Sequence, residues 1–305
     1  MTRPRVAVLL ATHDGAAWLG EQLDSILDQR DVDVCVVVSD DASGDGTAQI
    51  LAERSAADAR ITVLPALPAS GSAAANFARL FRDADVSGVD LVALSDQDDV
   101  WLPDKLARHA ALLAARGLDG VSSQVTAVRP DGSRRLVRKA FPQRPYDWVC
   151  ESPGPGSTFL LTPRLVSLVG DVVRSGLAAP VEFNDWLVYA VCRARGWGWH
   201  IDEVPSVDYR QHGDNVMGAN HGRSAALARL RLVRSRWHRS QALAVVDVGL
   251  AVVPPSGRPA LQRLRGDLAG GGPVHRLALA RRAGQLRRRP RDRVLLAALV
   301  LAGIW

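Results

Sequence analysis

The 305-residue sequence predicts an α/β fold, a Rossmann-like mixed and mainly parallel sheet followed by a basic, mainly helical C-terminal extension. Short apolar, β-branched runs alternate with segments of helical spacing through the first 130 residues, which is the βαβ pattern of a parallel sheet covered on both faces. Two of these runs, 34–38 and 89–94, lead directly into acidic clusters. Ligands bind outside the carboxyl ends of strands in open α/β sheets, so the clusters mark a candidate site.

The elements follow in chain order. Four apolar runs predict strands, over 6–11, 34–38, 61–64 and 89–94. Helical spacing predicts four helices between and after them, over 18–27, 47–54, 76–82 and 103–116. Pro103 suits a first helical turn because its missing N–H is no loss there. Beyond Gly120 the expected elements are a hairpin (120–128 and 134–137, turning at Asp131-Gly132), a Pro- and Gly-rich loop (153–157), a short apolar segment (159–161), helices (163–173 and 184–195) and a strand (197–201).

The acidic run Ser95-Asp96-Gln97-Asp98-Asp99 directly follows the fourth strand. Three carboxylates at such spacing repel one another and raise each other's pKa unless a positive group neutralises them. Mg²⁺ and Mn²⁺ prefer carboxylate oxygens, and Mg²⁺ commonly takes one or two protein carboxylates together with the phosphates of its ligand. The run therefore predicts a metal-bound diphosphate, with an acidic loop facing water as the alternative interpretation.

A second cluster, 40–47, follows the strand over 34–38. Its alternative interpretation is a helix entry, because Asp45 and Thr47 are good capping residues and the neighbouring glycines permit a tight turn. Both interpretations hold together if Asp45 caps the helix while Asp40 and Asp41 face the ligand.

The formal charge of +6 conceals two electrostatic halves. The segment 223–305 carries 17 Arg against three Asp, whereas the segment 1–222 carries 21 basic and 29 acidic side chains. Arginines interleaved with Leu and Val around 227–237, at 229, 231, 234 and 236, predict a basic amphipathic helix. An apolar run, 294–305, follows Arg287-Arg288-Arg289 but is too short to span a bilayer. We expect the segment 223–305 to contact an anionic membrane surface, with a solvated tail or an oligomer contact as the alternatives.

The sequence disfavours a nucleic-acid partner, a disulfide framework and a signal peptide. Nucleic acid is not the expected partner, because no zinc finger or other nucleic-acid signature accompanies the arginines. A disulfide framework is not expected, because Cys35, Cys150 and Cys192 are odd in number and lack metal-type spacing, so a reducing compartment is the default. A signal peptide is not expected either, because polar residues end the first apolar run at Thr12.

Five motifs together resemble, in order, those of family 2 glycosyltransferases, in particular the bacterial rhamnosyltransferase-like branch. They are Thr12-His13-Asp14-Gly15, the segment 40–47, the segment 95–101, Asn184-Asp185-Trp186, and the segment 209–216. The resemblance covers about residues 5–220. It implies the A-type glycosyltransferase fold, a nucleotide-diphosphate sugar donor and inversion at the anomeric carbon.

The resemblance also implies roles on the donor side. Asp40 or Asp41 would hold the nucleotide base, with Thr12 and Asp14 close to base and ribose. Asp96 and Asp98 match the Asp-x-Asp motif, and Asp98 is the first choice for the Mg²⁺ or Mn²⁺ ligand. Asp99 would bind sugar hydroxyls.

Asp185 is the expected general base, which takes the proton of the acceptor hydroxyl on the face opposite the leaving group. The alternative is that Asn184 or Asp185 only caps the following helix. His212 is a third candidate, as a metal ligand or a phosphate contact, although a lone His is often structural. Arg210 and Asn215 are weaker companions on the donor side. The Gln-x-x-Arg-Trp motif of the family's processive synthases is missing, which favours transfer of a single sugar.

The sequence thus predicts a catalytic domain over 1–222, with a nucleotide-sugar-binding half (1–130) and an acceptor-binding half (131–222), and a basic region over 223–305. The expected reaction is metal-dependent, inverting transfer of one sugar, rhamnose from dTDP-rhamnose being one possibility, to a surface-polysaccharide or lipid-linked glycan at the cytoplasmic face of the membrane. Two alternatives stay open. One is an inactive membrane-associated scaffold of the same fold. The other is a sugar nucleotidyltransferase, whose Gly-rich basic loop is missing from 12–20.

Overall fold

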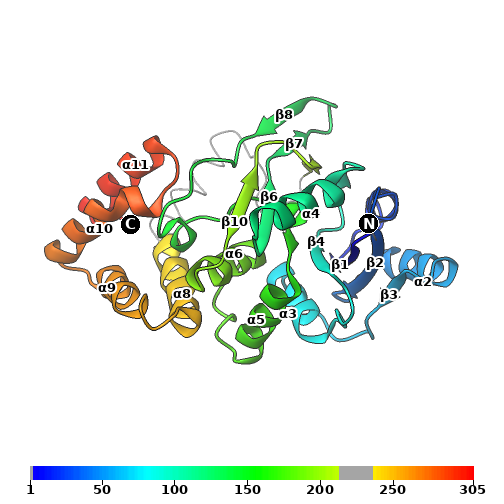
Figure 1. The fold of residues 1–305 in the computed structure, drawn as a ribbon, viewed down its shortest axis with the longest axis horizontal. Helices are drawn as coiled ribbons and strands as arrows, with labels where there is room; N and C mark the ends of the chain where they lie inside the picture. Colours follow the sequence, from blue (N-terminus) through cyan, green and yellow to red (C-terminus); the bar gives the residue numbers. More distant parts are fainter. Residues whose placement is uncertain (1–2, 213–235) are drawn as a thin grey trace.

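The computed structural model describes residues 3–212 and 236–305, and a seven-stranded sheet lies at its centre (Figure 1). In spatial order its strands are β10 (Trp199–Asp202), β6 (Gly120–Ser123), β9 (Leu160–Leu161), β4 (Leu91–Ser95), β1 (Arg5–Thr12), β2 (Asp33–Asp40) and β3 (Ile61–Val63). β9 runs antiparallel to both its neighbours, and the other pairs are parallel. The predicted mixed, mainly parallel sheet is confirmed.

Helices cover both faces of this sheet, as the alternation of side chains along β1 requires. In the segment 3–212 they are α1 (Leu19–Leu27), α2 (Thr47–Ala57), α3 (Ala73–Asp83), α4 (Lys105–Arg116), α5 (Pro163–Arg174) and α6 (Asn184–Ala194). Val8 and Leu10 of β1 belong to a buried cluster with Leu19 of α1, whereas Leu9 belongs to a second cluster with Phe77 of α3. Successive residues of a strand point to opposite faces, so β1 is buried on both.

The acidic clusters lie at one edge of the sheet because the central strands are parallel and in register. Thr12 at the end of β1 pairs with Asp40 at the end of β2, and Leu10 pairs with Ser95 at the end of β4. The Asn76 side chain, buried at the start of α3, donates to the backbone oxygens of Thr12 and Ser39, both at 3.0 Å. It ties together the two strand ends that carry the first acidic cluster.

Two expected boundaries differ from the structure. The expected strand over 120–128 divides at Gln124 into β6 and β7 (Val125–Val128), and β7 forms the predicted hairpin with β8 (Arg134–Val137) in a second sheet. That four-stranded sheet is completed by β11 (Val207–Arg210) and β5 (Val100–Trp101), in the order β5-β11-β7-β8. α4 begins at Lys105 with Asp104 as its N-cap, so Pro103 lies just before the helix and not in its first turn as expected.

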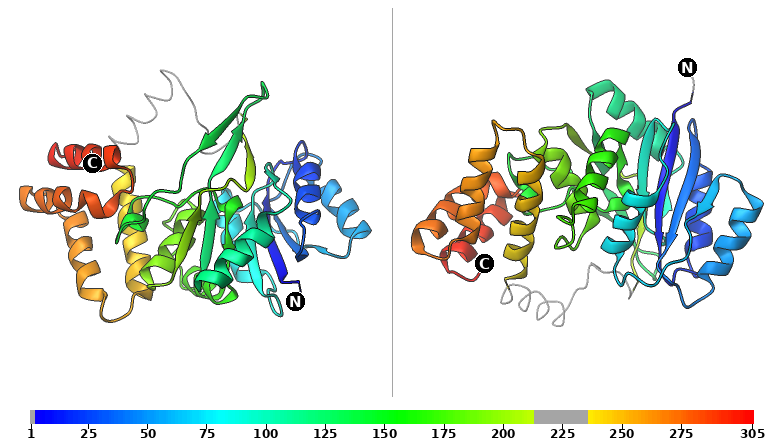
Figure 2. Two further views of the ribbon diagram at one scale, coloured as in Figure 1. Left: turned by 45° about the horizontal axis from the view of Figure 1, so that its top comes forward. Right: turned by 90° about the horizontal axis from the view of Figure 1, so that it is seen from below.

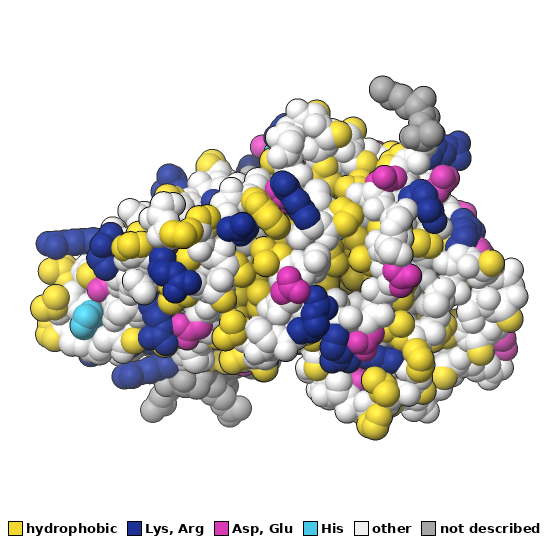
Figure 3. Space-filling view, turned by 60° about the horizontal axis from the view of Figure 1, so that its bottom comes forward, with side chains coloured by type: hydrophobic (Ala, Val, Ile, Leu, Met, Phe, Trp, Pro, Cys, Tyr) yellow, Lys and Arg dark blue, Asp and Glu magenta, His cyan; other side chains and the backbone are white. Residues whose placement is uncertain are grey.

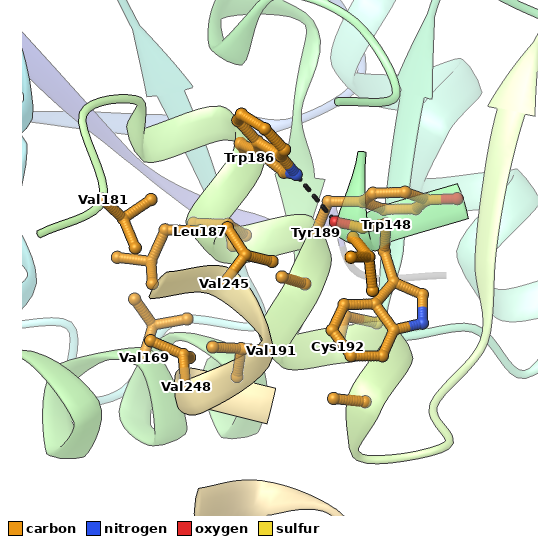
Figure 4. Close-up of a cluster of buried hydrophobic side chains, with 14 of the residues drawn as sticks. Trp148, Val169, Val181, Trp186, Leu187, Tyr189, Val191, Cys192, Val245 and Val248 are labelled. Carbon is orange, nitrogen blue, oxygen red and sulfur yellow. Dashed lines mark hydrogen bonds between the residues drawn. The ribbon is translucent and has the colours of Figure 1, made fainter. Parts of the chain in front are cut away.

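The C-terminal region is helical, as expected, and lies at the end of the molecule opposite β3 and α2 (Figures 1 and 2). Its helices are α8 (Trp237–Val252), α9 (Arg258–Ala269), α10 (Pro273–Leu286) and α11 (Pro290–Leu301). α8 packs on α6, where Val245 and Val248 enter the buried cluster around Tyr189 (Figure 4). A Cβ at Gly249 would lie 2.7 Å from the Trp148 ring, so glycine allows α8 its close approach.

Some features expected from the sequence lie outside the described residues, and others can be compared with the structure. Most of the expected amphipathic helix over 227–237, with Arg229, Arg231 and Arg234, lies outside the described residues, as do Asn215 and the domain boundary at 222. All three cysteines are free thiols, as expected. Within 3–212 and 236–305, every helix is too short or too polar to cross a bilayer.

Candidate active site

Four carboxylates gather around Tyr209 of β11. Three of them, on Asp96, Asp98 and Asp99, follow β4, and the fourth, on Asp185, lies in the first turn of α6. Burial, and then the charges of these four groups, raise the pKa of the Tyr209 hydroxyl, which therefore stays protonated at neutral pH. The sheet edge thus brings the Asp-x-Asp run and the expected general base to one place.

The carboxylates also perturb one another. Burial, followed by the charges of Asp98 and Asp185, raises the pKa of Asp96 to about 7. The pKa of Asp99, which is 1% exposed, is raised well above its usual value by burial and then by Asp98 and Asp96. Carboxyl groups held this way are harder to ionise than exposed ones, a nearby cation would favour their ionised form, and clustered perturbed groups of this kind mark functional sites.

His212 meets Asp98 directly. Its Nε2 lies 2.7 Å from Asp98 Oδ2, and its ring stacks on Trp18 with centroids 4.1 Å apart. The stack fixes the plane of the imidazole, so that the ring nitrogen is aimed at the carboxylate. The structure therefore places together Asp98 and His212, two of the three side chains that the sequence proposed as metal ligands, the third being Asp96.

Arg210 connects the acidic run to α1. Its backbone N–H donates to Asp99 Oδ1 at 3.2 Å, its Nε donates to the backbone oxygen of Asp98 at 3.0 Å, and its Nη2 lies 2.6 Å from Glu21 Oε2. Arg210 is thus held against the acidic run by two hydrogen bonds, and its guanidinium also pairs with Glu21 of α1.

Asp185 is held by a serine beside the Pro- and Gly-rich loop. Its Oδ1 accepts from the Trp186 N–H at 2.7 Å, and its Oδ2 lies 2.8 Å from Ser152 Oγ. The Ser152 hydroxyl also lies 2.8 Å from Gly154 O, and an ionised carboxylate is the stronger acceptor for its single proton. Burial raises the pKa of Asp185, while these hydrogen bonds and the charge of Lys139 oppose the rise. The helix begins at Asn184 after Phe183, so neither Asn184 nor Asp185 is the N-cap residue, although Asp185 accepts one N–H of the first turn through its Oδ1.

The expected nucleoside-binding residues form a hydrogen-bonded group at the ends of β1 and β2. Thr12 Oγ1 donates to Asp40 Oδ1 at 2.7 Å, and Asp41 accepts from two N–H groups of the loop at Ser70 and Gly71. Asp14 accepts from the Gly44 N–H at 2.7 Å. The structure brings these residues together and uses their carboxylates to fix the surrounding loops.

Asp45 has the helix-entry role that was expected of it. Its Oδ1 accepts from the Thr47 N–H at 2.8 Å, at the first residue of α2. A bond from the Thr47 hydroxyl, together with bonds from the N–H groups of Ala16 and Thr47, lowers the pKa of Asp45.

Sequence reasoning missed two residues that shape this edge. The Gln97 amide bonds both backbone groups of His13, accepting from its N–H and donating to its oxygen, each at 2.7 Å. A Cβ on Gly15 would lie 2.3 Å from Gln97 Oε1, so only glycine leaves room for this amide. Ser152 is the second, and its sequence signal is no more than its position beside the loop 153–157.

The acidic run fits a divalent cation in part. Among the described residues no three side chains of ligand type converge on one point, but Asp98 and His212 form a pair of oxygen and nitrogen donors. Mg²⁺ needs only one or two protein ligands when water and phosphate complete its shell. Burial, and then the charges of Asp98 and Asp185, raise the pKa of neighbouring Asp96, so a cation beside it would favour its ionised form. The residues present therefore fit a cation that a diphosphate helps to hold.

Comparison with known proteins identifies the family of this chain. The model of glycosyl transferase family 2 matches residues 7–164. The chain is also 33% identical over 299 residues, 97% of its length and 100% of the relative, to the dTDP-rhamnosyl transferase RfbG of Shigella flexneri. The chain belongs to glycosyl transferase family 2, and it is a glycosyltransferase. The resemblance stated from its motifs is confirmed.

Two solved structures share the fold. TarS 1–349 of S. aureus, in complex with UDP-GlcNAc, has a TM-score of 0.53 at 14% identity, with 98% of this chain and 92% of that chain covered. The mannosyltransferase PcManGT of Pyrobaculum calidifontis, in complex with GDP-Man and Mn²⁺, has a TM-score of 0.52 at 21% identity, with 99% and 86% covered. At such identities the likeness establishes the A-type glycosyltransferase fold alone.

Proposed function

We propose that the chain transfers a single sugar, rhamnose from dTDP-rhamnose, to a surface-polysaccharide or lipid-linked glycan, with inversion at the anomeric carbon. One observation carries the proposal: the turn Gly156–Thr158 contacts both β4, which leads into the acidic run, and Asp185 on α6, to whose Cβ an added Cβ on Gly156 would lie 3.8 Å. The identity of the donor is supported by the 33% identity to the dTDP-rhamnosyl transferase over nearly the whole chain.

Asp185 would take the proton from the acceptor hydroxyl as that oxygen attacks the anomeric carbon. Its Ser152 and Trp186 hydrogen bonds fix the orientation of the carboxylate, and its raised pKa makes it a better proton acceptor than an exposed aspartate. A positioned base of this kind contributes roughly 10² to 10⁴ in rate.

The donor would lie along the edge formed by β1, β2 and β4. Thr12, Asp14, Asp40 and Asp41 would contact base and ribose through lone pairs not used by the loops, and Asp99 would contact sugar hydroxyls. Asp98 and His212, with Asp96 beside them, would hold Mg²⁺ or Mn²⁺, with Arg210 next to the phosphates. A bound divalent cation supplies Lewis-acid stabilisation of the charge that develops on the departing diphosphate.

The C-terminal helices support a membrane-surface partner and a peripheral position at the cytoplasmic face. The segment 236–305 carries 13 Arg against three Asp. Large apolar side chains are more than 40% exposed on α10, α11 and the segment after them, at Val274, Leu277, Val294, Leu295, Leu301 and Ile304. In Figure 3 the end with these helices carries many dark-blue and yellow groups and few magenta ones. Arginines around exposed apolar groups match an anionic lipid interface.

Sedimentation with liposomes tests this surface. We expect the full chain to bind vesicles with anionic lipid and to lose binding with Val294→Asp/Leu295→Asp, while Leu67→Asp, at an exposed apolar residue of the catalytic part, still binds. Binding that ignores both anionic lipid and the α11 substitutions would contradict the membrane partner.

Asp185→Asn tests the proposed reaction. The variant keeps size and helix position but has no base, so we expect dTDP-rhamnose to bind as in wild type and transfer to fall roughly 10²- to 10⁴-fold. Calorimetry measures the binding, and the anomeric coupling of the product by NMR reports inversion. Normal turnover by Asp185→Asn, or retention of configuration, would contradict the mechanism.

A further inference from the structure

Arg288 of the C-terminal region reaches the segment that holds Asp185. It lies between α10 and α11 and is 4% exposed, although arginines are seldom buried without partners. Its side chain packs into the catalytic part of the chain rather than toward solvent. A buried cation at this place needs a reason beyond solubility or lipid contact.

The hydrogen bonds and ion pairs of Arg288 with the catalytic part lie in the segment 147–152, and its guanidinium also lies 5.9 Å from the centre of the Tyr189 ring. Its backbone N–H donates to Glu151 Oε1 at 2.5 Å, and its Nη2 donates to the backbone oxygen of Ser152. Its Nε lies 3.4 Å from Glu151 Oε1 and 3.8 Å from Oδ2 of the fully buried Asp147. One arginine therefore fixes both ends of the 147–152 segment.

The same segment ends in the hydrogen bond to the general base. Ser152 accepts from Arg288 through its backbone oxygen and lies 2.8 Å from Asp185 Oδ2 through its hydroxyl. Beyond Ser152 the chain forms a loop in which Gly156 lies against Asp185, where an added Cβ would be 3.8 Å from Asp185 Cβ. Two contacts thus connect a residue of the C-terminal helices to the reacting carboxylate.

We propose that Arg288 is a positioning residue for Asp185 and acts through Ser152, so that the C-terminal helices complete the acceptor side of the active site. The inference rests on the proposed role of Asp185 as general base. Ser152 belongs to a loop in which its Oγ also accepts from the Gly154 N–H at 3.2 Å, so the direction of its hydroxyl depends on how the backbone on either side is anchored. Arg288 supplies that anchor from a distant point of the chain.

The neighbouring Arg289 is a matched control. It also bonds the catalytic part, through its Nη2 to the backbone oxygen of Arg138 at 2.6 Å and by lying 4.5 Å from the Phe141 ring. These contacts fall on the segment 138–141, before the one that Arg288 anchors. Loss of charge or of general docking would affect both arginines, whereas loss of Ser152 positioning would affect Arg288 alone.

The experiment compares Arg288→Met, Arg288→Lys, Ser152→Ala and Arg289→Met in the full chain. Turnover is measured as dTDP release from dTDP-rhamnose, with water and then octyl glycosides as acceptors, and calorimetry measures dTDP binding. We expect Arg288→Met and Ser152→Ala each to lower kcat roughly 10- to 100-fold, the loss that a misplacement of about 1 Å produces, with dTDP binding within about twofold of wild type. Arg289→Met should keep the wild-type kcat.

Two further readouts separate positioning from damage to the fold. The double variant Arg288→Met/Ser152→Ala should lose no more than either single variant, because both act on one contact. Hydrogen exchange should become faster in peptides covering 151–158 in Arg288→Met and not in Arg289→Met, which can be measured without turnover. Arg288→Lys keeps the charge near Asp147 and should restore folding if Arg288→Met does not fold, while still lacking the second donor to Ser152.

The outcomes distinguish this inference from the proposed function. If Asp185→Asn turns over as fast as wild type, Asp185 is not the general base, and there is then no base for Arg288 to position. If Asp185→Asn is inactive but Arg288→Met or Arg288→Lys keeps the wild-type kcat, the proposed role of Arg288 is wrong while the general base stands. Unchanged exchange over 151–158 in the folded Arg288 variant, or equal losses in Arg288→Met and Arg289→Met, also overturns it.

Discussion

Asn76→Ala tests how the donor edge of the sheet is held. The Asn76 amide is 3% exposed and donates to the oxygens of Thr12 and Ser39 at the ends of β1 and β2. Alanine would remove one hydrogen bond from each of these buried carbonyl groups, while the Thr12 oxygen would keep the bond from the Asp41 N–H at 2.9 Å. A hydrogen bond contributes about 0.5 to 1.5 kcal/mol net, so we expect the free energy of unfolding to fall by about 1 to 3 kcal/mol, the sum for two bonds.

Urea unfolding measures this loss, and calorimetric dTDP binding measures its effect on the site. Because Thr12 bonds Asp40 at the loosened edge, we expect weaker dTDP binding as well. Gln49→Ala is the control, since its amide bonds Glu53 on the exposed face of α2 and its loss should change stability by less than about 0.5 kcal/mol. An Asn76→Ala protein as stable as the Gln49→Ala protein would refute the reasoning.

Three further predictions concern charge. Lys105 is fully buried, with its Nζ 3.5 Å from the centroid of the Trp101 ring, and burial lowers the pKa of its amine. The folded state therefore binds fewer protons than the unfolded state. For this reason the free energy of unfolding falls as the pH drops below about 10.4. Lys105→Met should raise stability at pH 7 by about 1 to 4 kcal/mol, with the gain vanishing above pH ~10.4, and a less stable variant at pH 7 contradicts this. The base Asp185 must be ionised and burial raises its pKa, so kcat should fall about tenfold per pH unit on the acid side of that pKa, which a flat profile down to about pH 4 would disprove. Mn²⁺ with dTDP should raise the thermal midpoint of wild type but not of Asp98→Ala, and equal shifts in both would exclude Asp98 as a ligand.

Much of the sheet could be predicted because its signals are local. β1, β2 and β4 are apolar runs, and the helices between them show their own spacing. The division at Gln124 could not be predicted, since apolar residues alternate on both sides of it. It is decided by pairing of β6 with β10 and of β7 with β11, and both partner strands come much later in the chain.

The residues of the candidate site could likewise be predicted only where their sequence signals are local. Asp96, Asp98 and Asp99 are close together in sequence and follow a strand, so strand-end chemistry identified them together. The hydrogen bonds from Ser70 and Gly71 to Asp41, and from Ser152 to Asp185, depend on loops whose backbone no local pattern specifies. The contact of Arg288 with Ser152 joins distant parts of the chain, and the basic run 287–289 was interpreted only as a charged surface.

Release of nucleoside diphosphate tests the transferase most directly. The purified full chain would be incubated with dTDP-rhamnose, UDP-GlcNAc and GDP-mannose, with Mg²⁺ or Mn²⁺ or with a chelator, beside Asp98→Ala. We predict release from dTDP-rhamnose that needs the metal and is lost in the variant. Absence of release from every donor, together with no metal-linked dTDP binding by calorimetry, would contradict the proposed function and favour an inactive protein of the same fold.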